Sequence, residues 1–173
     1  MEQNKIPSNT IGITNAKNNF PYTLLGLSFL TQPQGKQIFF NSAALINAHG
    51  EILGKYHKTH LIPFGEYVPM SRLFSFIEPV AALGDFERGT FLEPLSLEVW
   101  KLAPLICGED IFPEIARRQT INGAHLFVNL TNNAWFGYSS QPYQHLAMAV
   151  FRSIENRRTT VRARCSQAAP WLP

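Results

Sequence analysis

The chain has 173 residues, of which 45% are hydrophobic and 16% are charged, and this composition fits one globular domain with a hydrophobic core. Its net charge is +3, and its basic residues are scattered except near the C-terminus, which argues against a nucleic-acid-binding footprint and leaves acidic lipid head groups as compatible partners. Two cysteines are too few for a disulfide framework, the polar N-terminus does not resemble a signal peptide, and no stretch of about 20 apolar residues is available to span a bilayer.

The first half of the chain is predicted to consist mainly of strands. Residues 1–21 are polar and show no clear pattern. Apolar and alternating residues predict three strands, which lie at 22–30, buried on both faces, and at 38–46 and 51–56. The last two form a hairpin in which Gly50 takes a positive φ. Residues 57–69 are predicted to be irregular, and a long ordered loop with charged residues is a common place for a functional site.

The second half alternates between strands and helices. Strands are predicted at about 91–97, 99–106 and 125–130 and from 159, and helices at about 113–121 and 142–158. In the second helix, Leu146, Val150 and Ile154 recur every four residues on one face. A run of strands followed by this alternation predicts a layered α/β sandwich. Residues 164–173 do not continue the pattern.

Cys107 lies where the predicted strand 99–106 ends and a turn leads towards a helix. Such a position holds a side chain out from a rigid support, which is a common setting for a nucleophile. A thiol attacks as the thiolate, so a cation is expected nearby, and Lys58 is the candidate that the sequence offers. Taken alone, Cys107 would be interpreted as a small buried hydrophobe, and Lys58, without Cys107 in its motif, as a solvated loop lysine.

Three ordered motifs carry a resemblance to a known family. They are Gly-Lys-Tyr-His-Lys-Thr-His-Leu-Ile-Pro-Phe-Gly-Glu-Tyr-Val-Pro at 54–69, Leu-Ile-Cys-Gly-Glu-Asp-Ile-Phe-Pro-Glu at 105–114, and Asn-Leu-Thr-Asn-Asn-Ala-Trp-Phe-Gly at 129–137, followed by Gln-Pro-Tyr-Gln-His at 141–145. Over about residues 22–163 the chain resembles the nitrilase-type domain of the bacterial apolipoprotein N-acyltransferases. The first two motifs also fit the wider carbon–nitrogen hydrolase superfamily, and the third points to the acyltransferases.

The resemblance implies a nitrilase-like α-β-β-α sandwich that is incomplete at both ends. Residues 1–21 would be a poorly matched segment, 22–163 a partial catalytic domain and 164–173 an aberrant tail. The family's Glu-Lys-Cys triad maps Cys107 onto the nucleophile and Lys58 onto the lysine. Its glutamate lies in an upstream Pro-Glu motif that Glu2 does not match, so this chain by itself is expected to be inactive. Cys165 is expected to play no part in the mechanism.

The resemblance also supplies further candidates for the active site. Glu66 and Glu109 match acidic residues near the family's active site. Glu66 is expected either to orient Lys58 or to accept backbone N–H groups of its loop, and Glu109 either to act in catalysis or to cap the helix that follows. The backbone N–H of Gly108, where the family usually has tyrosine, is expected to stabilise an oxyanion together with Lys58.

Other polar residues are assigned to the surroundings of this site. Asn132, Asn133 and Trp135 are expected to line the pocket, although Trp135 fits the edge of the core equally well. Three histidines lack the spacing of metal ligands and are interpreted as hydrogen bonders that shape loops: His57, His60 and His145. We therefore expect no metal and no cofactor.

The reaction that the resemblance implies is transfer of a fatty acyl group from a phospholipid to the N-terminal diacylglyceryl-cysteine of apolipoproteins, through a thioester on the nucleophilic cysteine. It implies a bacterial inner-membrane protein whose catalytic domain faces the periplasm. Residues 73–77 would form a mobile arm on the membrane surface, with core packing as the alternative. Two other interpretations stay open: a soluble amidase of the same superfamily, and a catalytically inactive fragment.

Overall fold

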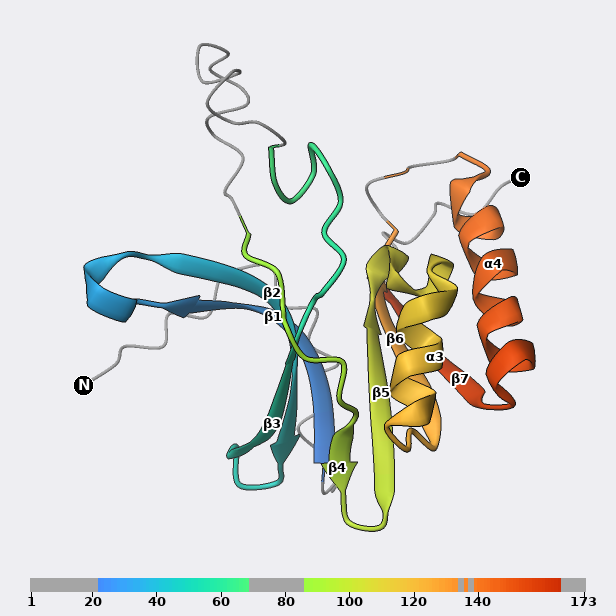
Figure 1. The fold of residues 1–173 in the computed structure, drawn as a ribbon, viewed down its shortest axis with the longest axis horizontal. Coiled ribbons are helices and arrows are strands. Elements are labelled where there is room, and N and C mark those ends of the chain that lie inside the picture. Colours follow the sequence, from blue (N-terminus) through green and yellow to red (C-terminus); the bar gives the residue numbers. More distant parts are fainter. Residues whose placement is uncertain (1–21, 69–85, 134–135, 137–138, 166–173) are drawn as a thin grey trace, which may run out of the picture. The chain divides into compact units, whose positions relative to one another are not determined.

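The structure is a computed structural model that describes residues 22–68, 86–133, 136 and 139–165. The chain divides into two compact units, Met1–Phe91 and Leu92–Pro173, and each unit is considered by itself. The first contains the strands drawn in blue and teal in Figure 1, and the second contains a sheet with its helices. In the described part of the chain, no helix is both long enough and apolar enough to cross a membrane.

The sheet of the first unit is antiparallel, in the order β1-β2-β3. Its strands are β1 (Tyr22–Thr31), β2 (Ile38–Asn47) and β3 (Ile52–His57). Gly50 has a φ of 82° in the turn between β2 and β3, as predicted, because this turn needs a backbone conformation that a side chain disfavours. Asn47 closes the same turn by accepting the N–H groups of His49 and Glu51 with its side-chain oxygen.

The predicted burial of β1 on both faces is wrong. Most residues of β1 are half-buried, and several towards its C-terminal end are exposed. Among the described residues β1 pairs only with β2, so it is an edge strand of this sheet. The buried strand is β2, in which Ser42, Ala43, Ala44 and Leu45 have almost no accessible surface.

The second unit has a four-stranded sheet in the order β4-β5-β6-β7. Its elements are β4 (Leu95–Leu97), β5 (Trp100–Ile106), the 3-10 helix η2 (Cys107–Ile111), α3 (Pro113–Ile121), β6 (Leu126–Asn132), α4 (Gln141–Asn156) and β7 (Thr159–Cys165). Strands β5, β6 and β7 run parallel, while β4 joins β5 as an antiparallel hairpin. Strand β4 is shorter than the predicted 91–97, and Pro94, which cannot donate to a ladder, directly precedes it.

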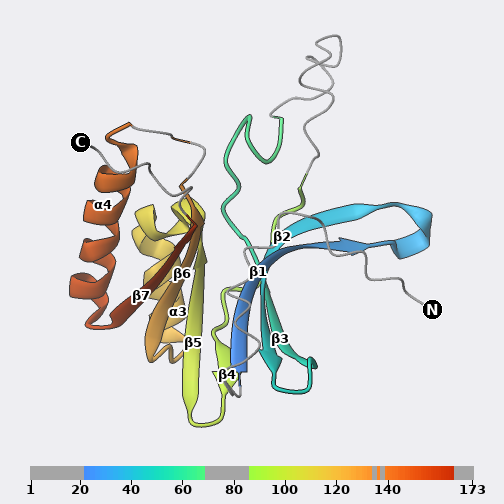
Figure 2. The ribbon, with the colours of Figure 1, turned by 180° about the vertical axis from the view of Figure 1, so that it is seen from behind.

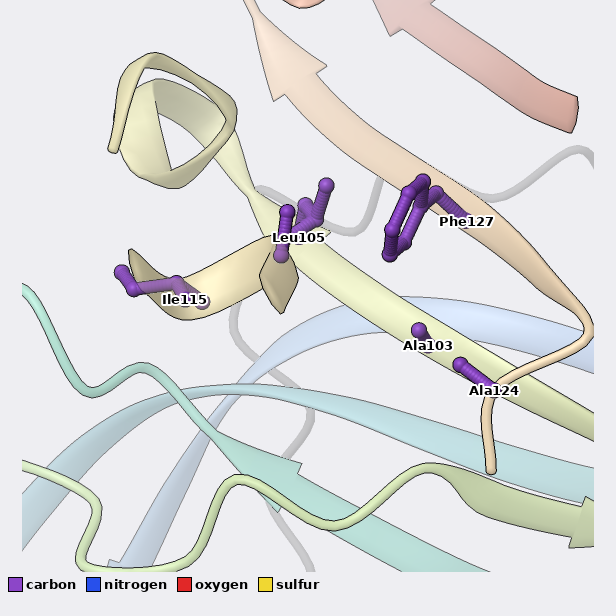
Figure 3. Packing of buried hydrophobic residues seen from close by; sticks show 6 residues of the cluster. Ala103, Leu105, Ile115, Ala124 and Phe127 are labelled. Atoms are coloured by element: carbon purple, nitrogen blue, oxygen red, sulfur yellow. The ribbon is translucent and has the colours of Figure 1, made fainter. Parts of the chain in front are cut away.

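The core of this unit lies between the sheet and α3. Figures 1 and 2 show α3 and α4 on the same side of the sheet, as expected when successive parallel strands are joined by crossovers of one hand. The buried cluster consists of Ala103, Leu105, Ile115, Ala116, Ala124 and Phe127. Ala103 on β5 leaves room for the ring of Phe127, its partner in register on the neighbouring strand β6 (Figure 3). This packing fixes the C-terminal end of β5, where Cys107 follows.

Helix α4 forms where the four-residue repeat predicted it, but its apolar residues face outward. Leu146, Val150 and Ile154 are all exposed, whereas the buried side chains of the helix include His145 and Arg152. The face towards the sheet is therefore partly polar. It is held by hydrogen bonds, such as that from the Arg152 guanidinium to the backbone oxygen of Ile111 at 2.8 Å.

Candidate active site

Cys107 lies at the carboxyl end of β5, immediately after four buried residues. Its φ is 52°, a left-handed conformation that is uncommon for any residue other than glycine. The residue is half-buried and begins η2. A sharp, strained turn after a rigid strand presents a side chain at the end of the sheet, and backbone strain of this kind concentrates at functional sites.

Glu109 holds the turn that follows β5 by a hydrogen bond between its buried side chain and the backbone. Its side chain is fully buried, and its carboxylate accepts the backbone N–H of Ile106 at 2.9 Å. A carboxylate near the first N–H groups of a helix is favourable, because it accepts a donor that has no partner within the helix. This contact caps η2, the 3-10 helix that contains Glu109, and not the helix at 113–121 that follows, so both roles expected for Glu109 stay predictions.

The backbone oxygen of Cys107 points to two side chains from neighbouring elements. Asn129, fully buried on β6, donates its amide N–H to this oxygen at 3.0 Å and to the oxygen of Leu105 at 3.2 Å. The Nε2 atom of His145 on α4 lies 3.2 Å from the same oxygen of Cys107. The interpretation of His145 as a hydrogen bonder that shapes a loop agrees with this contact.

His145 belongs to a buried charged cluster. Its Nε2 atom lies 2.5 Å from Oδ1 of Asp110, and its Nδ1 atom lies 2.8 Å from Nη2 of Arg162. Arg162 also donates to Oδ2 of Asp110 at 2.8 Å, which closes a triangle of three side chains from η2, α4 and β7. Asp110 is fully buried and His145 nearly so, so the carboxylate is paired where an unpaired charge would be very costly.

Lys58 follows β3 in the first unit and is nearly fully buried, with 1% of its side chain exposed. Its ammonium group lies 2.8 Å from Oε1 and 2.7 Å from Oε2 of Glu66. Glu66 also accepts the amide of Asn41 at 2.6 Å and the backbone N–H of Ile62 at 2.8 Å. Glu66 thus makes both contacts that its two expected roles would require, because it contacts Lys58 and accepts a loop backbone N–H.

The backbone around Lys58 is equally constrained. Its N–H donates to the oxygen of Asn41 at 2.8 Å, and its oxygen accepts the N–H of Gly89 at 2.8 Å. A Cβ atom on Gly89 would lie only 2.1 Å from the backbone oxygen of His57, so only glycine allows this approach.

Two histidines flank Lys58, and burial lowers the pKa of both. For His57 the burial is reinforced by the charge of Lys55. For His60 it is reinforced by Arg88 and then Lys58, and is opposed by Glu66. The ring of His57 packs on Phe40, and its Nδ1 atom lies 2.6 Å from the hydroxyl of Ser42, so it shapes the end of β3.

The remaining predicted site residues are only partly described. Asn132 ends β6, and Asn133 is buried and accepts the hydroxyl of Thr131 at 3.0 Å. Trp135, the arm at 73–77 and the Cys165 side chain lie outside the described residues. Within the described ranges, no group of three or more His, Cys, Asp or Glu side chains is placed to hold a metal ion.

Sequence reasoning missed several polar residues that the structure brings together. Asp110 and Asn129 stand inside the quoted motifs without an assigned role, and Arg162 stands in a predicted strand. An arginine in a strand with apolar neighbours was the available signal, since a buried guanidinium needs a carboxylate. Its partner Asp110 is 52 positions away and cannot be identified from spacing.

Comparison with known proteins connects this geometry to a family. A family model described as carbon–nitrogen hydrolase matches residues 13–167. An apolipoprotein N-acyltransferase from Geobacter metallireducens is 48% identical over 126 residues, which cover 72% of this chain and 24% of that protein. The chain therefore spans about a quarter of the length of this curated relative.

Two solved structures show the same fold. The crystal structure of a carbon–nitrogen hydrolase from Helicobacter pylori G27 matches with a TM-score of 0.62 at 21% identity, over 83% of this chain and 45% of that one. A variant amidase from Nesterenkonia sp. AN1, in which acrylamide has added to the active-site cysteine, matches with a TM-score of 0.54 at 26% identity, over 83% and 48%. The predicted nitrilase-like α/β fold class is confirmed by these matches and by the two sheets.

Proposed function

Because the chain belongs to the carbon–nitrogen hydrolase family, we propose that Cys107 is the nucleophile of an N-acyltransferase active site. The observation that carries this proposal is the strained backbone of Cys107, with a φ of 52°, at the end of a buried strand. Acyl transfer is favoured over amide hydrolysis because the chain is 48% identical to a named apolipoprotein N-acyltransferase and 26% identical to an amidase.

The proposed reaction has two half-reactions that share one thioester. The Cys107 thiol gives up its proton, and the thiolate attacks the ester carbonyl of a phospholipid. A C–S bond forms, the C–O bond breaks, and the lysophospholipid oxygen takes up the proton that the thiol gave up. The amino group of a diacylglyceryl-cysteine then attacks the thioester carbonyl. A C–N bond forms, the C–S bond breaks, and the proton lost by the amine returns to the thiolate.

Each remaining residue has a proposed role in this chemistry. Lys58 supplies the cation of the triad, and the N–H of Gly108 supplies a donor for the oxyanion. Glu66 holds Lys58 through both carboxylate oxygens, and Glu109 holds the turn through the N–H of Ile106, so we assign both carboxylates to positioning. That Lys58 lies near the sulfur of Cys107 stays a prediction, since the two residues belong to different units. Asn132, Asn133 and Trp135 stay candidates for the pocket.

The proposal extends to the partners and the location of the protein. A phospholipid acyl donor and an apolipoprotein acceptor meet at a membrane surface, so the protein would act at the bacterial inner membrane with this domain facing the periplasm. The relatives' name supports lipoprotein substrates in general.

A chimera tests the proposal. The matching 126-residue segment of the Geobacter relative is replaced by the corresponding residues of this chain, and the chimera is expressed in cells depleted of their own N-acyltransferase. We expect N-acylated lipoprotein by mass spectrometry, and its loss with Cys107→Ser. A chimera that accumulates in the membrane, leaves lipoproteins unacylated and releases ammonia from small amides would replace acyl transfer by amidase chemistry.

A further inference from the structure

We propose that the buried cluster Asp110–His145–Arg162, together with Asn129, is a positioning device that aims the backbone N–H of Gly108 at the reacting carbonyl. This inference rests on the proposed function for the identity of the reaction. The juxtaposition behind it is that one backbone oxygen, that of Cys107, lies within 3.2 Å of both Asn129 Nδ2 and His145 Nε2.

The hydrogen bonds of the cluster fix the tautomer of His145. Arg162 has only N–H groups to offer, so Nδ1 of His145, 2.8 Å from Nη2, must be an acceptor. The proton of a neutral ring then sits on Nε2, which faces Oδ1 of Asp110 and the oxygen of Cys107. The partner of one histidine nitrogen sets the role of the other, so the contact with Arg162 places the single proton on Nε2. Nε2 donates this proton to Oδ1 of Asp110 at 2.5 Å and shares it with the oxygen of Cys107 at 3.2 Å.

Fixing this oxygen also fixes the next N–H. The C=O of Cys107 and the N–H of Gly108 belong to one planar peptide group, and no peptide bond in the described residues is cis. In a trans peptide these two bonds point in opposite directions. With the oxygen held by Asn129 and His145 on the interior side, the Gly108 N–H is directed away from them, and the peptide cannot rotate without losing both hydrogen bonds.

This arrangement matters because oxyanion stabilisation depends on donors that are aligned before the reaction begins. The φ of 52° at Cys107 is uncommon for a non-glycine residue, so a peptide without these restraints would relax towards other conformations. A misdirected donor weakens attack on a carbonyl, where negative charge develops on oxygen. It leaves direct alkylation of the thiolate unaffected, because no oxyanion forms there.

The test compares these two reactions on the purified chimera with the Geobacter relative, because this chain by itself is expected to be inactive. His145→Met removes the donor, His145→Gln keeps an N–H near the position of Nε2, and Gln144→Met on the exposed face of α4 is the matched control. Thioester formation from an activated acyl ester is followed by mass spectrometry, and alkylation of Cys107 by iodoacetamide is measured in parallel. Loss of one oxyanion donor costs about 10²–10³-fold in rate, so misalignment is expected to slow acylation by about 10–100-fold with His145→Met, with alkylation changed by less than about threefold.

His145→Gln should restore most of the acylation rate, and Gln144→Met should behave as the unmodified chimera. Equal decreases in the acylation and alkylation rates would show that the cluster only maintains the structure, and would overturn the proposal. An unchanged acylation rate in His145→Met would also overturn it.

A spectroscopic measurement separates this proposal from the proposed function and does not depend on acylation or on the folding of a variant. Long-range proton–nitrogen correlation in the unmodified chain should show His145 protonated on Nε2 only. Slow exchange of the Arg162 side-chain N–H should accompany it. A ring protonated on Nδ1 would refute the inference even if acyl transfer were established, whereas absent acylation with the expected tautomer would count against the function and not against the positioning device.

Discussion

Replacing Glu66 by glutamine should strongly destabilise the first unit. The carboxylate accepts four hydrogen bonds: two from the ammonium group of Lys58, one from Asn41 and one from the N–H of Ile62. Glutamine keeps the shape of the side chain but replaces one acceptor oxygen by an NH2 group. Because both oxygens of Glu66 accept hydrogen bonds, this NH2 group faces hydrogen-bond donors whichever oxygen it replaces. It also removes the negative charge beside a lysine that is 1% exposed. Removing one partner of a buried ion pair costs about 3–5 kcal/mol, and we take about 3 kcal/mol because 12% of the Glu66 side chain is exposed.

Segment-resolved hydrogen exchange is the suitable assay, because two compact units need not unfold in a single transition. A loss of about 3 kcal/mol should accelerate exchange in β2 and β3 by about 100-fold, since about 1.4 kcal/mol corresponds to a factor of ten. Glu51→Gln makes the same chemical change on an exposed hairpin of the same sheet and should have little effect. Less than about fivefold acceleration in Glu66→Gln, or equal acceleration in β5, would refute the reasoning.

Two further predictions concern other parts of the chain. Gly89→Ala should destabilise the first unit by more than about 2 kcal/mol in urea unfolding, because its Cβ would lie 2.1 Å from a backbone oxygen. Gly108→Ala is the control and should be neutral or stabilising, because the nearest neighbour of its Cβ would be 3.8 Å away. Similar effects of the two substitutions would contradict this prediction. Hydrogen bonds from Arg117 and then Arg118 lower the pKa of Glu114 to about 2, so the carboxylate contributes stability above its ordinary pKa of 4.5 that is lost as the pH falls towards 2. Glu114→Gln should slightly reduce the change of the urea midpoint with pH between pH 4.5 and about pH 2. The effect should be smaller at high salt, because the ion pairs of Glu114 with Arg117 and Arg118 are exposed. An unchanged dependence of the midpoint on pH at low salt would count against this prediction.

Local signals explain why most elements were predictable. The helix at 113–121 was expected with the bounds that α3 has, because Pro113 suits its first turn and the following Asn122 and Gly123 end it. Gly123 has a φ of 91°, as a residue at a helix end often does. Burial was less predictable, because it depends on which elements pack against each other. The sequence did not indicate that β1 would be an edge strand, or which face of α4 would turn towards the sheet.

In the candidate site, too, the features that depend on local sequence were predictable and those that depend on neighbouring elements were not. The position of Cys107 at a strand end followed from pattern, and the contact of Glu66 with Lys58 was one of two expectations that the resemblance supplied. The residues that hold the Cys107 backbone come from β6, α4 and β7, and their contacts depend on the order of strands in the sheet. Asn129 is buried in β6, where an apolar residue would have matched the strand pattern, and only the structure shows that its amide serves two backbone oxygens.

Glycine at position 107 should be more stable than alanine, which reverses the usual order. In an ordinary strand, glycine costs about 0.5–1 kcal/mol relative to alanine, because it loses more conformational freedom on folding. At Cys107 the φ of 52° penalises any Cβ, and a left-handed conformation costs a non-glycine residue about 1–2 kcal/mol. Both Cys107→Gly and Cys107→Ala remove the sulfur, so their difference isolates the backbone, and we expect Cys107→Gly to be more stable by about 1 kcal/mol in urea unfolding followed by tryptophan fluorescence.

Ser96, exposed on β4, provides the control, where alanine should be more stable than glycine. If alanine is also the more stable residue at position 107, the strain of the turn is smaller than the entropic cost of glycine, and the reasoning is refuted. The hydrogen bonds of Asn129 and His145 to the Cys107 oxygen would then stabilise a conformation that is only weakly strained. If glycine is the more stable residue, the native cysteine is kept at an energetic cost, because a thiol has to be presented at that point. The buried Asp110–His145–Arg162 cluster is then part of what offsets that cost.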